Sequence, residues 1–264
     1  MKKYFSYFIS SWKSCTAYKV DYFLNFLFSL VFFFISFALW KTIYGSEGFQ
    51  GIGGYSLVST ITYYFVTNII FRLDLGVSVW LNNDIWSGYL TNDLVRPWNV
   101  KIVENMYAFA NLFVGFVIFI PFLTIIYFAA HQYIVLPTGP DLLYFIITLI
   151  IGLIFSGLFA FTLQSLAFYF GDQDANIELS NYLVMILAGG MFPLIFLPEK
   201  IAHIFNALPF KILFDVPANI WLGKMAWPQI LHSWIEAGIW IVAMYVIFTF
   251  LYKNGLKRYT GTGR

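Results

Sequence analysis

Long apolar runs alternate with short polar segments along the whole of this 264-residue chain. Each run approaches or exceeds the roughly 20 residues that an α-helix needs to cross the core of a bilayer. The pattern therefore predicts an all-α integral membrane protein that folds as a single transmembrane domain over residues 1–264. The six predicted transmembrane helices cover residues 22–40, 55–71, 103–130, 142–170, 179–197 and 230–252.

Residues 1–20 are too polar to span a membrane, but they carry a regular apolar stripe. On a helix this stripe lies opposite a face of Lys and Ser residues, which is typical of a helix lying in the membrane interface. We therefore predict an N-terminal interfacial helix, with a disordered basic tail as the alternative. The stripe consists of Tyr4, Phe5, Phe8, Ile9 and Trp12.

Residues 198–228 are apolar, but Pro198, Pro209, Pro217 and Pro228 cut them into short pieces. Pieces of this length cannot cross a bilayer. Any non-helical backbone at that depth must be covered by protein, because lipid offers it no hydrogen bonds. The segment is therefore predicted to form re-entrant or interfacial half-helices between spans five and six.

Composition strengthens the membrane assignment, because only 11% of the residues are charged, against about 25% in a typical soluble domain. Lys and Arg are enriched on the cytosolic side of membrane proteins. Placing the N-terminus inside puts most of the 15 Lys and Arg residues on that side. Both termini and residues 75–101 are thus predicted to be cytosolic, while residues 198–228 face outward. The basic residues on the outer side are Lys41, Lys200, Lys211 and Lys224.

The sequence offers little for catalysis or metal binding. The three histidines have no partner at metal-ligand or catalytic-triad spacing. No phosphate-binding G-x-x-x-x-G-K-[ST] loop occurs, so the chain cannot hydrolyse ATP by that route. We expect no catalytic residue, no metal site and no cofactor bound by this chain. An acidic loop is interpreted as a solvated turn or a contact for a basic partner rather than as a divalent-ion site, and it holds Asp172, Asp174 and Glu178.

Polar amides inside the spans are costly in lipid and tend to face a protein interior. Because they carry no formal charge, they argue against a proton- or sodium-driven carrier, and helix–helix hydrogen bonds are their expected role. Aromatic side chains of the fifth span and the hairpin either line an exit path or serve ordinary packing. The amides are Asn25, Asn68, Asn111 and Gln164, and the aromatics are Phe192, Phe196, Phe205, Phe210 and Phe214.

The polar segment between spans two and three has a compact pattern. It predicts a short amphipathic helix, a break at Gly88, a second short turn and then Arg96-Pro97. A rigid cytosolic segment between two membrane helices would allow a separate soluble protein to bind there and transmit its own movement to the membrane helices.

Two short motifs carry a resemblance to a known family. The phrase Ile85-Trp86-Ser87-Gly88-Tyr89-Leu90, followed by Leu94-Val95-Arg96-Pro97, resembles the "I-x-x-G-x-L … L-x-R-P" signature of one branch of the ABC-2 type permeases, once described as a domain of unknown function. Gly190-Met191-Phe192-Pro193, with Leu197-Pro198 and Leu208-Pro209, resembles that branch's "G-x-x-x-P … L-P … P" run. The resemblance covers essentially the whole chain.

The resemblance implies a permease subunit of an ATP-binding cassette exporter in the bacterial inner membrane. It would pair with a second permease chain, identical or paralogous, and with two copies of a separate ATPase that binds ATP and Mg. Lipid would surround it, and nucleic acid is not an expected partner. Residues 75–101 would form the coupling segment, and spans one, two and five would border the path. The implied coupling residues are Asp84, Ile85, Trp86, Gly88, Tyr89, Leu90, Arg96 and Pro97, and the implied gate or pathway residues are Asn25, Gly189, Gly190, Phe192, Pro193 and Phe196.

Two other classes compete with this interpretation. A stand-alone membrane-embedded enzyme or immunity-type protein, acting on a lipid or peptide, would be active as a lone chain and would cluster polar residues at one depth. An ion-coupled carrier would show internal repeats and an acid near the middle of the membrane. Neither pattern is seen in the sequence, whereas the exporter subunit predicts an obligate soluble partner with a phosphate loop.

Overall fold

The computed structural model describes residues 9–10, 12, 19–45, 51, 53–72, 80–95, 117, 119–171 and 174–261. The regular elements within these ranges are helices. The predicted interfacial helix and the first half of the 103–130 run lie almost wholly outside the described residues, as do Arg96, Pro97 and Asn111.

Three of the described helices are long and apolar enough to cross a membrane. They are Leu27–Tyr44 within α2 (Lys19–Tyr44), Gly139–Phe170, which joins α7 (Gly139–Gln164) to α8 (Ala167–Phe170), and α12 (Trp227–Leu256). Shorter apolar helices lie within α3 (Leu57–Arg72) and α9 (Asp174–Leu187), and residues 119–130 are also helical.

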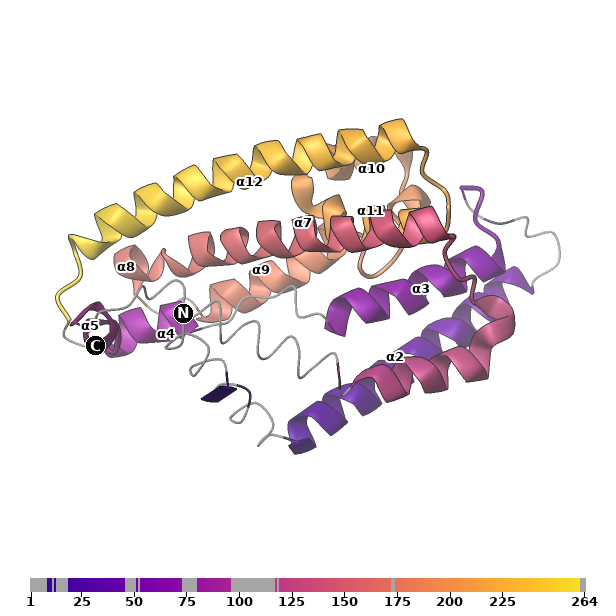
Figure 1. Ribbon diagram of the computed structural model, residues 1–264, viewed down its shortest axis with the longest axis horizontal. Coiled ribbons are helices and arrows are strands. Elements are labelled where there is room, and N and C mark those ends of the chain that lie inside the picture. Colours follow the sequence, from indigo (N-terminus) through magenta and orange to yellow (C-terminus); the bar gives the residue numbers. More distant parts are fainter. Residues whose placement is uncertain are drawn as a thin grey trace.

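The helices lie roughly along one direction, so the molecule has two distinct ends (Figure 1). One end holds α4 (Trp80–Ser87), α5 (Leu90–Val95), α8 and the last turn of α12. We call it the α4–α5 end. The other holds α10 (Glu199–Ala207), η3 (Pro209–Ile212) and α11 (Asp215–Trp221), together with the start of α7 and α12. We call it the α10–α11 end.

Proline and acidic residues mark where two of the long helices begin. Pro140 lies in the first turn of α7, with Asp141 beside it, and Pro228 lies in the first turn of α12. Proline suits this position because its missing N–H would have no acceptor inside the helix. Asp141 also accepts a hydrogen bond from the hydroxyl of Thr138, the residue before α7. Both helices therefore start at the α10–α11 end and run toward the α4–α5 end.

Helices α7 and α12 lie side by side, with α12 along one edge of the molecule and α7 nearer its middle (Figure 1). The indole N–H of Trp234 on α12 donates to Thr148 Oγ1 on α7 at 2.8 Å, and the rings of Phe161 and Phe248 lie 5.6 Å apart nearer the other end. A buried core of aromatic and branched side chains joins this pair to α3 and α11. Polar groups in that core are hydrogen-bonded to distant parts of the chain, for example the Tyr63 hydroxyl to the Gly189 carbonyl and the Trp221 indole N–H to the Val135 carbonyl.

Two of the predicted spans end earlier as helices than their hydropathy suggests. The 142–170 run is helical to Gln164, turns at Ser165 and Leu166, and resumes as the single turn α8. In the 179–197 run, α9 ends at Leu187, because Gly189 takes a φ of +81° that a continuing helix cannot use.

The two halves of the 198–228 segment have opposite surroundings. Helix α10 has no buried residue, and its Ile201 and Ile204 are exposed. Helix α11 lies in the core, with Val216, Ala218 and Ile220 buried against α7 and α3. The short pieces predicted from the prolines are therefore one surface helix and one interior helix.

Candidate functional site

The segment that contains the predicted coupling residues folds as two short helices joined by a tight turn. Gly88 has a φ of +83°, the left-handed region that glycine enters without a steric penalty. The Gly88 N–H donates to the carbonyl of Ile85 at 3.4 Å, and the Gly88 carbonyl accepts from Thr91 N–H at 3.2 Å. The turn therefore sets the angle between α4 and α5.

One face of this helix pair is buried. Leu81, Ile85 and Leu90 share an apolar cluster with Ala167 of α8, and with Phe248 and Tyr252 of α12. Leu81 and Ile85 are four residues apart, so they lie on the same side of α4. The helix pair is thereby held against the ends of both α7–α8 and α12.

A buried amide reinforces this attachment. Gln164, the last residue of α7, is 1% exposed. Its Oε1 accepts from the backbone N–H of Leu81 at 3.0 Å and from that of Asn82 at 3.4 Å. These are the second and third residues of α4, whose N–H groups have no acceptor within their own helix. The amide of span four therefore caps the first turn of α4.

The other face of the helix pair is exposed, and it carries four large apolar side chains together with the polar Asn83, Ser87, Thr91 and Asn92. Trp86 is 43% exposed, Tyr89 66% and Val95 81%. Leu94 is exposed beside them. Large apolar side chains gathered on an exposed face are typical of a surface that another protein covers. We call the surface formed by Trp86, Tyr89, Leu94 and Val95 the α4–α5 face.

The structure thus divides the predicted coupling residues by position. Ile85 and Leu90 point inward and attach the segment, whereas Trp86 and Tyr89 point outward. Gly88 forms the turn, and Asp84 is half-buried. Arg96 and Pro97 lie outside the described residues.

The end of the chain adjoins the same helix pair. The hydroxyls of Tyr259 and Thr91 lie 3.3 Å apart, and the rings of Tyr259 and Phe168 lie 6.0 Å apart. A Cβ built on Gly255 would overlap the ring of Phe168, so α12 and α8 are in close contact there. Residues after α12 therefore complete the packing around α5.

At the α10–α11 end, the break after α9 is bonded to α3. The hydroxyl of Tyr63 donates to the carbonyl of Gly189 at 2.6 Å, and that of Tyr64 donates to the carbonyl of Met191 at 2.8 Å. These two tyrosines replace the helical hydrogen bonds that the backbone loses at the break. We call residues 188–198 the gate segment.

Asp215, the first residue of α11, is the polar centre of this region. Its Oδ1 accepts from Leu194 N–H at 3.1 Å and lies 3.2 Å from the Tyr63 hydroxyl. Its Oδ2 accepts from the Asn219 amide at 3.1 Å, and its own N–H donates to the Ala188 carbonyl at 3.0 Å. Asp215 therefore joins the gate segment, α3 and α11.

Sequence reasoning did not single out Asp215. The sequence does contain a feature that could have drawn attention to Asp215. It is the one acidic residue between Glu199 and Glu236, and it lies in an apolar stretch that is interrupted by prolines. An acid in such surroundings needs several donors. Its partners, however, come from distant parts of the chain, so the spacing around Asp215 does not reveal them.

The structure also places the residues predicted to gate the path. Phe196 packs against Trp40 of α2 and Tyr55, with ring centroids 5.3 Å and 5.5 Å apart. Gly189, Gly190 and Pro193 are buried, and Phe192 is half-buried. Asn25 lies on α2, and its side chain is outside the described part. The described residues that were predicted to gate the path thus lie together where α2, α3, α9 and α11 meet.

Two aromatics that could have lined an exit path serve packing instead. Phe214 is buried in the core. Phe210 lies between α7 side chains, with its ring centroid 5.9 Å from that of Phe155 and 5.3 Å from that of Phe159. Phe210 therefore joins η3 to α7, and Phe214, whose ring centroid lies 5.8 Å from that of Phe71, joins the start of α11 to α3.

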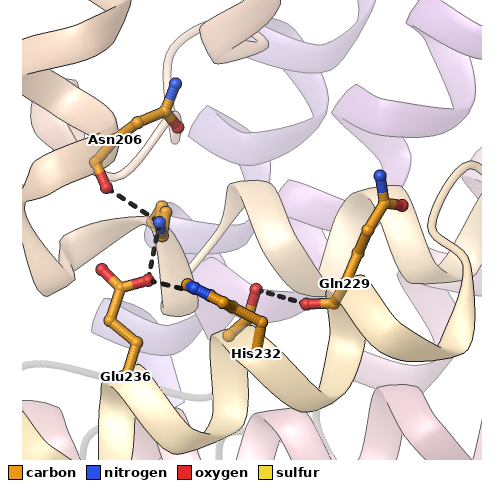
Figure 2. Close-up of polar contacts among 6 residues, drawn as sticks. Asn206, Gln229, His232 and Glu236 are labelled. Atoms are coloured by element: carbon orange, nitrogen blue, oxygen red, sulfur yellow. Dashed lines mark hydrogen bonds and ion pairs between the residues drawn. The ribbon is translucent and has the colours of Figure 1, made fainter.

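An ion pair connects the α10–η3 segment to α12 (Figure 2). Lys211 Nζ lies 2.8 Å from Glu236 Oε2, and it also donates to the carbonyl of Asn206 at 2.8 Å. His232, one turn earlier on α12, places Nδ1 3.9 Å from the same carboxylate oxygen. Because the Lys211 and Glu236 side chains are only 17% and 20% exposed, this pair is shielded from water more than a surface pair.

Replacing Glu236 by glutamine, or Lys211 by methionine, is expected to lower the free energy of unfolding by about 1–2 kcal/mol, because the remaining charge loses its half-buried partner. The double variant should be less destabilised than the sum of the two, with a coupling of about 1 kcal/mol. Thermal unfolding in detergent measures this. Glu199→Gln on the exposed helix α10 is the control and should leave the free energy of unfolding unchanged. If the effects of the Glu236 and Lys211 changes on the free energy of unfolding were strictly additive, the ion pair would not stabilise the protein.

Within the described ranges, no group of three or more His, Cys, Asp or Glu residues is placed to hold a metal ion.

Long apolar helices that run between two differently built ends define a helical integral membrane protein. Residues 28–263 match the model of the family described as ABC-2 family transporter protein, which is nearly the entire chain. The chain therefore belongs to the ABC-2 transporter family. Among curated proteins, none matches it.

Proposed function

We propose that the chain is the permease subunit of an ATP-binding cassette exporter, forming the transmembrane pathway and coupling it to a separate ATPase through residues 75–101. The α4–α5 face carries this proposal. Its outward side chains, Trp86 and Tyr89, suit contact with another protein, while Leu81, Ile85 and Leu90 attach the same helices to the membrane bundle. A push on this face would therefore reach α7 and α12.

The proposed topology has six spans and both termini in the cytosol, which places the α4–α5 end inside and the α10–α11 end outside. The full sequence supports it, because most of its 15 Lys and Arg residues, among them Lys253, Lys257 and Arg258 at the end of α12, fall on the proposed inner side, which positive charge favours. Residues 1–20 would lie in the inner interface, and α10 would lie in the outer one.

The gate segment would close the outer end of the path. It joins α2, α3, α9 and α11 through the rings around Phe196 and through the hydrogen bonds of Asp215. Packed elements of this kind have a small set of stable arrangements, so a displaced helix shifts them as a unit. Export would then alternate between this closed arrangement and an open one.

Two permease chains, identical or paralogous, would pair in the membrane above two ATPase copies that bind ATP and Mg. The test is the composition of the complex, purified gently from its own membrane through a tag on a flexible linker and weighed intact. Two membrane chains with two copies of a phosphate-loop protein would support the proposal. A lone chain or a homodimer without an ATPase, at any detergent strength, would favour the stand-alone enzyme or immunity-type protein.

A further inference from the structure

Gln164 of α7 bonds the backbone of another helix, whereas Thr148 of α7 bonds another helix through a side chain, the indole N–H of Trp234 on α12. The hydroxyls of Thr148, Ser156 and Thr162 each donate to a carbonyl of their own helix. Gln164 instead accepts from two N–H groups of α4, which are 83 and 82 residues away in the sequence. The end of α7 and the start of α4 are thus joined by a polar contact that does not come from either helix alone (Figure 1).

The hydrogen bonds of Gln164 fix the orientation of α4 relative to α7, which apolar packing alone does not do. A helix cap is normally supplied by the residue that precedes the helix. Here the acceptor comes from a transmembrane helix, and hydrogen bonds are directional, so the first turn of α4 must keep its orientation relative to α7. The cluster of Leu81, Ile85 and Phe248 attaches α4 as well, but apolar packing is non-directional and does not by itself fix the orientation of α4 relative to α7.

From Gln164, helix α7 leads without interruption to the gate. Along α7, the ring of Phe155 packs on Phe210 of η3, and a Cβ on Gly152 would lie 3.4 Å from the carbonyl oxygen of Ile212. Three residues later, Asp215 accepts from the N–H of Leu194 in the gate segment. The chain of contacts therefore runs from α4 through α7 and η3 to Asp215.

We propose that Gln164 is the positioning residue through which movement of α4 is transmitted to α7 and on to the gate segment. The inference rests on the proposed function, in which an ATPase moves α4. Leu81 and Ile85 attach α4 to the bundle by apolar packing, and the hydrogen bonds to the Gln164 amide oxygen cause α7 to move together with α4. Without the amide, the ATPase would still dock and turn over, but the gate would respond less.

The experiment reports on the gate without needing a substrate. Ile195 is 53% exposed, and a Cβ on Gly53 would lie 2.6 Å from its Cγ1, so opening of the gate segment would change its surroundings. Cysteine is placed at Ile195 in a background where Cys15 is serine. Labelling by a water-soluble maleimide is timed in nanodiscs that hold the complex with its ATPase and leave both membrane faces open to solution, with and without ATP plus vanadate.

With Gln164 in place, nucleotide is expected to change the labelling rate by roughly fivefold or more, the usual scale of coupling between sites. Gln164→Leu should remove most of this change while ATPase attachment and hydrolysis remain. Gln164→Glu, which keeps an acceptor at the positive end of α4, should retain most of it. Thr162→Val removes a hydroxyl that bonds only its own helix and should leave the change intact.

A full nucleotide response in Gln164→Leu would overturn the role of Gln164 and leave the proposed function standing. Loss of ATPase attachment in that variant would also overturn it, because Gln164 would then set docking. If Gln164→Leu does not accumulate, Gln164→Asn, whose shorter amide cannot reach Leu81, takes its place under the same criteria. No response even with Gln164 present would overturn the proposed function, and this inference with it.

Discussion

Replacing Trp86 and Tyr89 together by alanine is expected to detach the ATPase from the membrane subunit. Both side chains are exposed, so their removal takes little from the core. Buried aromatic anchors at a protein interface contribute about 2 kcal/mol or more each. Loss of two such anchors, about 4 kcal/mol together, corresponds to a weakening of roughly 700-fold or more, since 1.4 kcal/mol is tenfold in affinity. The measurement is the dissociation constant of the purified ATPase for permease in nanodiscs, alongside ATP-driven transport.

Two further variants separate docking from folding. Tyr245→Ala removes a similarly exposed ring from the middle of α12, away from the α4–α5 face, and should leave ATPase binding unchanged. Ile85→Ala removes an inward anchor, so it should lower the unfolding midpoint as well as binding. Undiminished ATPase binding by the Trp86 and Tyr89 double variant would exclude this face as the docking surface.

Gly189→Ala is expected to destabilise the α10–α11 end strongly. Gly189 has a φ of +81°, which costs about 1–2 kcal/mol for a residue with a Cβ. The added Cβ would also lie 2.7 Å from the Tyr63 hydroxyl and 3.1 Å from the Asp215 Cβ, and overpacking of this kind costs about 1–3 kcal/mol. Together these effects should lower the thermal unfolding midpoint by roughly 5–15 °C.

The matched control is another glycine of the bundle. Gly157 lies within α7, and a Cβ there would meet nothing within 4 Å. Gly157→Ala should therefore leave stability unchanged or raise it, because alanine favours a helix more than glycine does by about 1 kcal/mol. Equal midpoints for the Gly157 and Gly189 variants would show that the close contact of Gly189 with Tyr63 does not constrain the fold.

Asp215 bears on the alternative of an ion-coupled carrier. The sequence argument against that class was the lack of an acid within the spans, and the structure reveals an acid in the interior part of the hairpin. Its oxygens are occupied by Leu194, Tyr63 and Asn219. Those bonds hold three elements together, so Asp215 has a structural role that needs no transported ion.

Hydropathy alone predicted much of the architecture. The apolar runs around α2, α7 and α12 can be recognised as membrane-spanning from the sequence, because the length and hydropathy needed to cross a bilayer are properties of each run by itself. Family membership was also within reach of the sequence, since the motifs around Gly88 and Pro193 are local. Even the turn at Gly88 followed from residue type, because glycine accepts a positive φ.

The hydrogen bonds that would transmit movement from α4 to the gate segment could be found only in the tertiary structure. Gln164 and Leu81 are 83 residues apart in the sequence, and Tyr63 and Asp215 are 152 residues apart. The sequence around each of these residues does not indicate its hydrogen-bond partner. The difference between exposed α10 and buried α11 likewise follows from which helices surround them. Hydropathy is a sum over neighbouring residues in the chain, whereas the partner of a buried polar atom is set by which helices pack together. The sequence therefore determined that this protein is a helical membrane protein of the ABC-2 transporter family, and the packing decided which of its residues join the two ends.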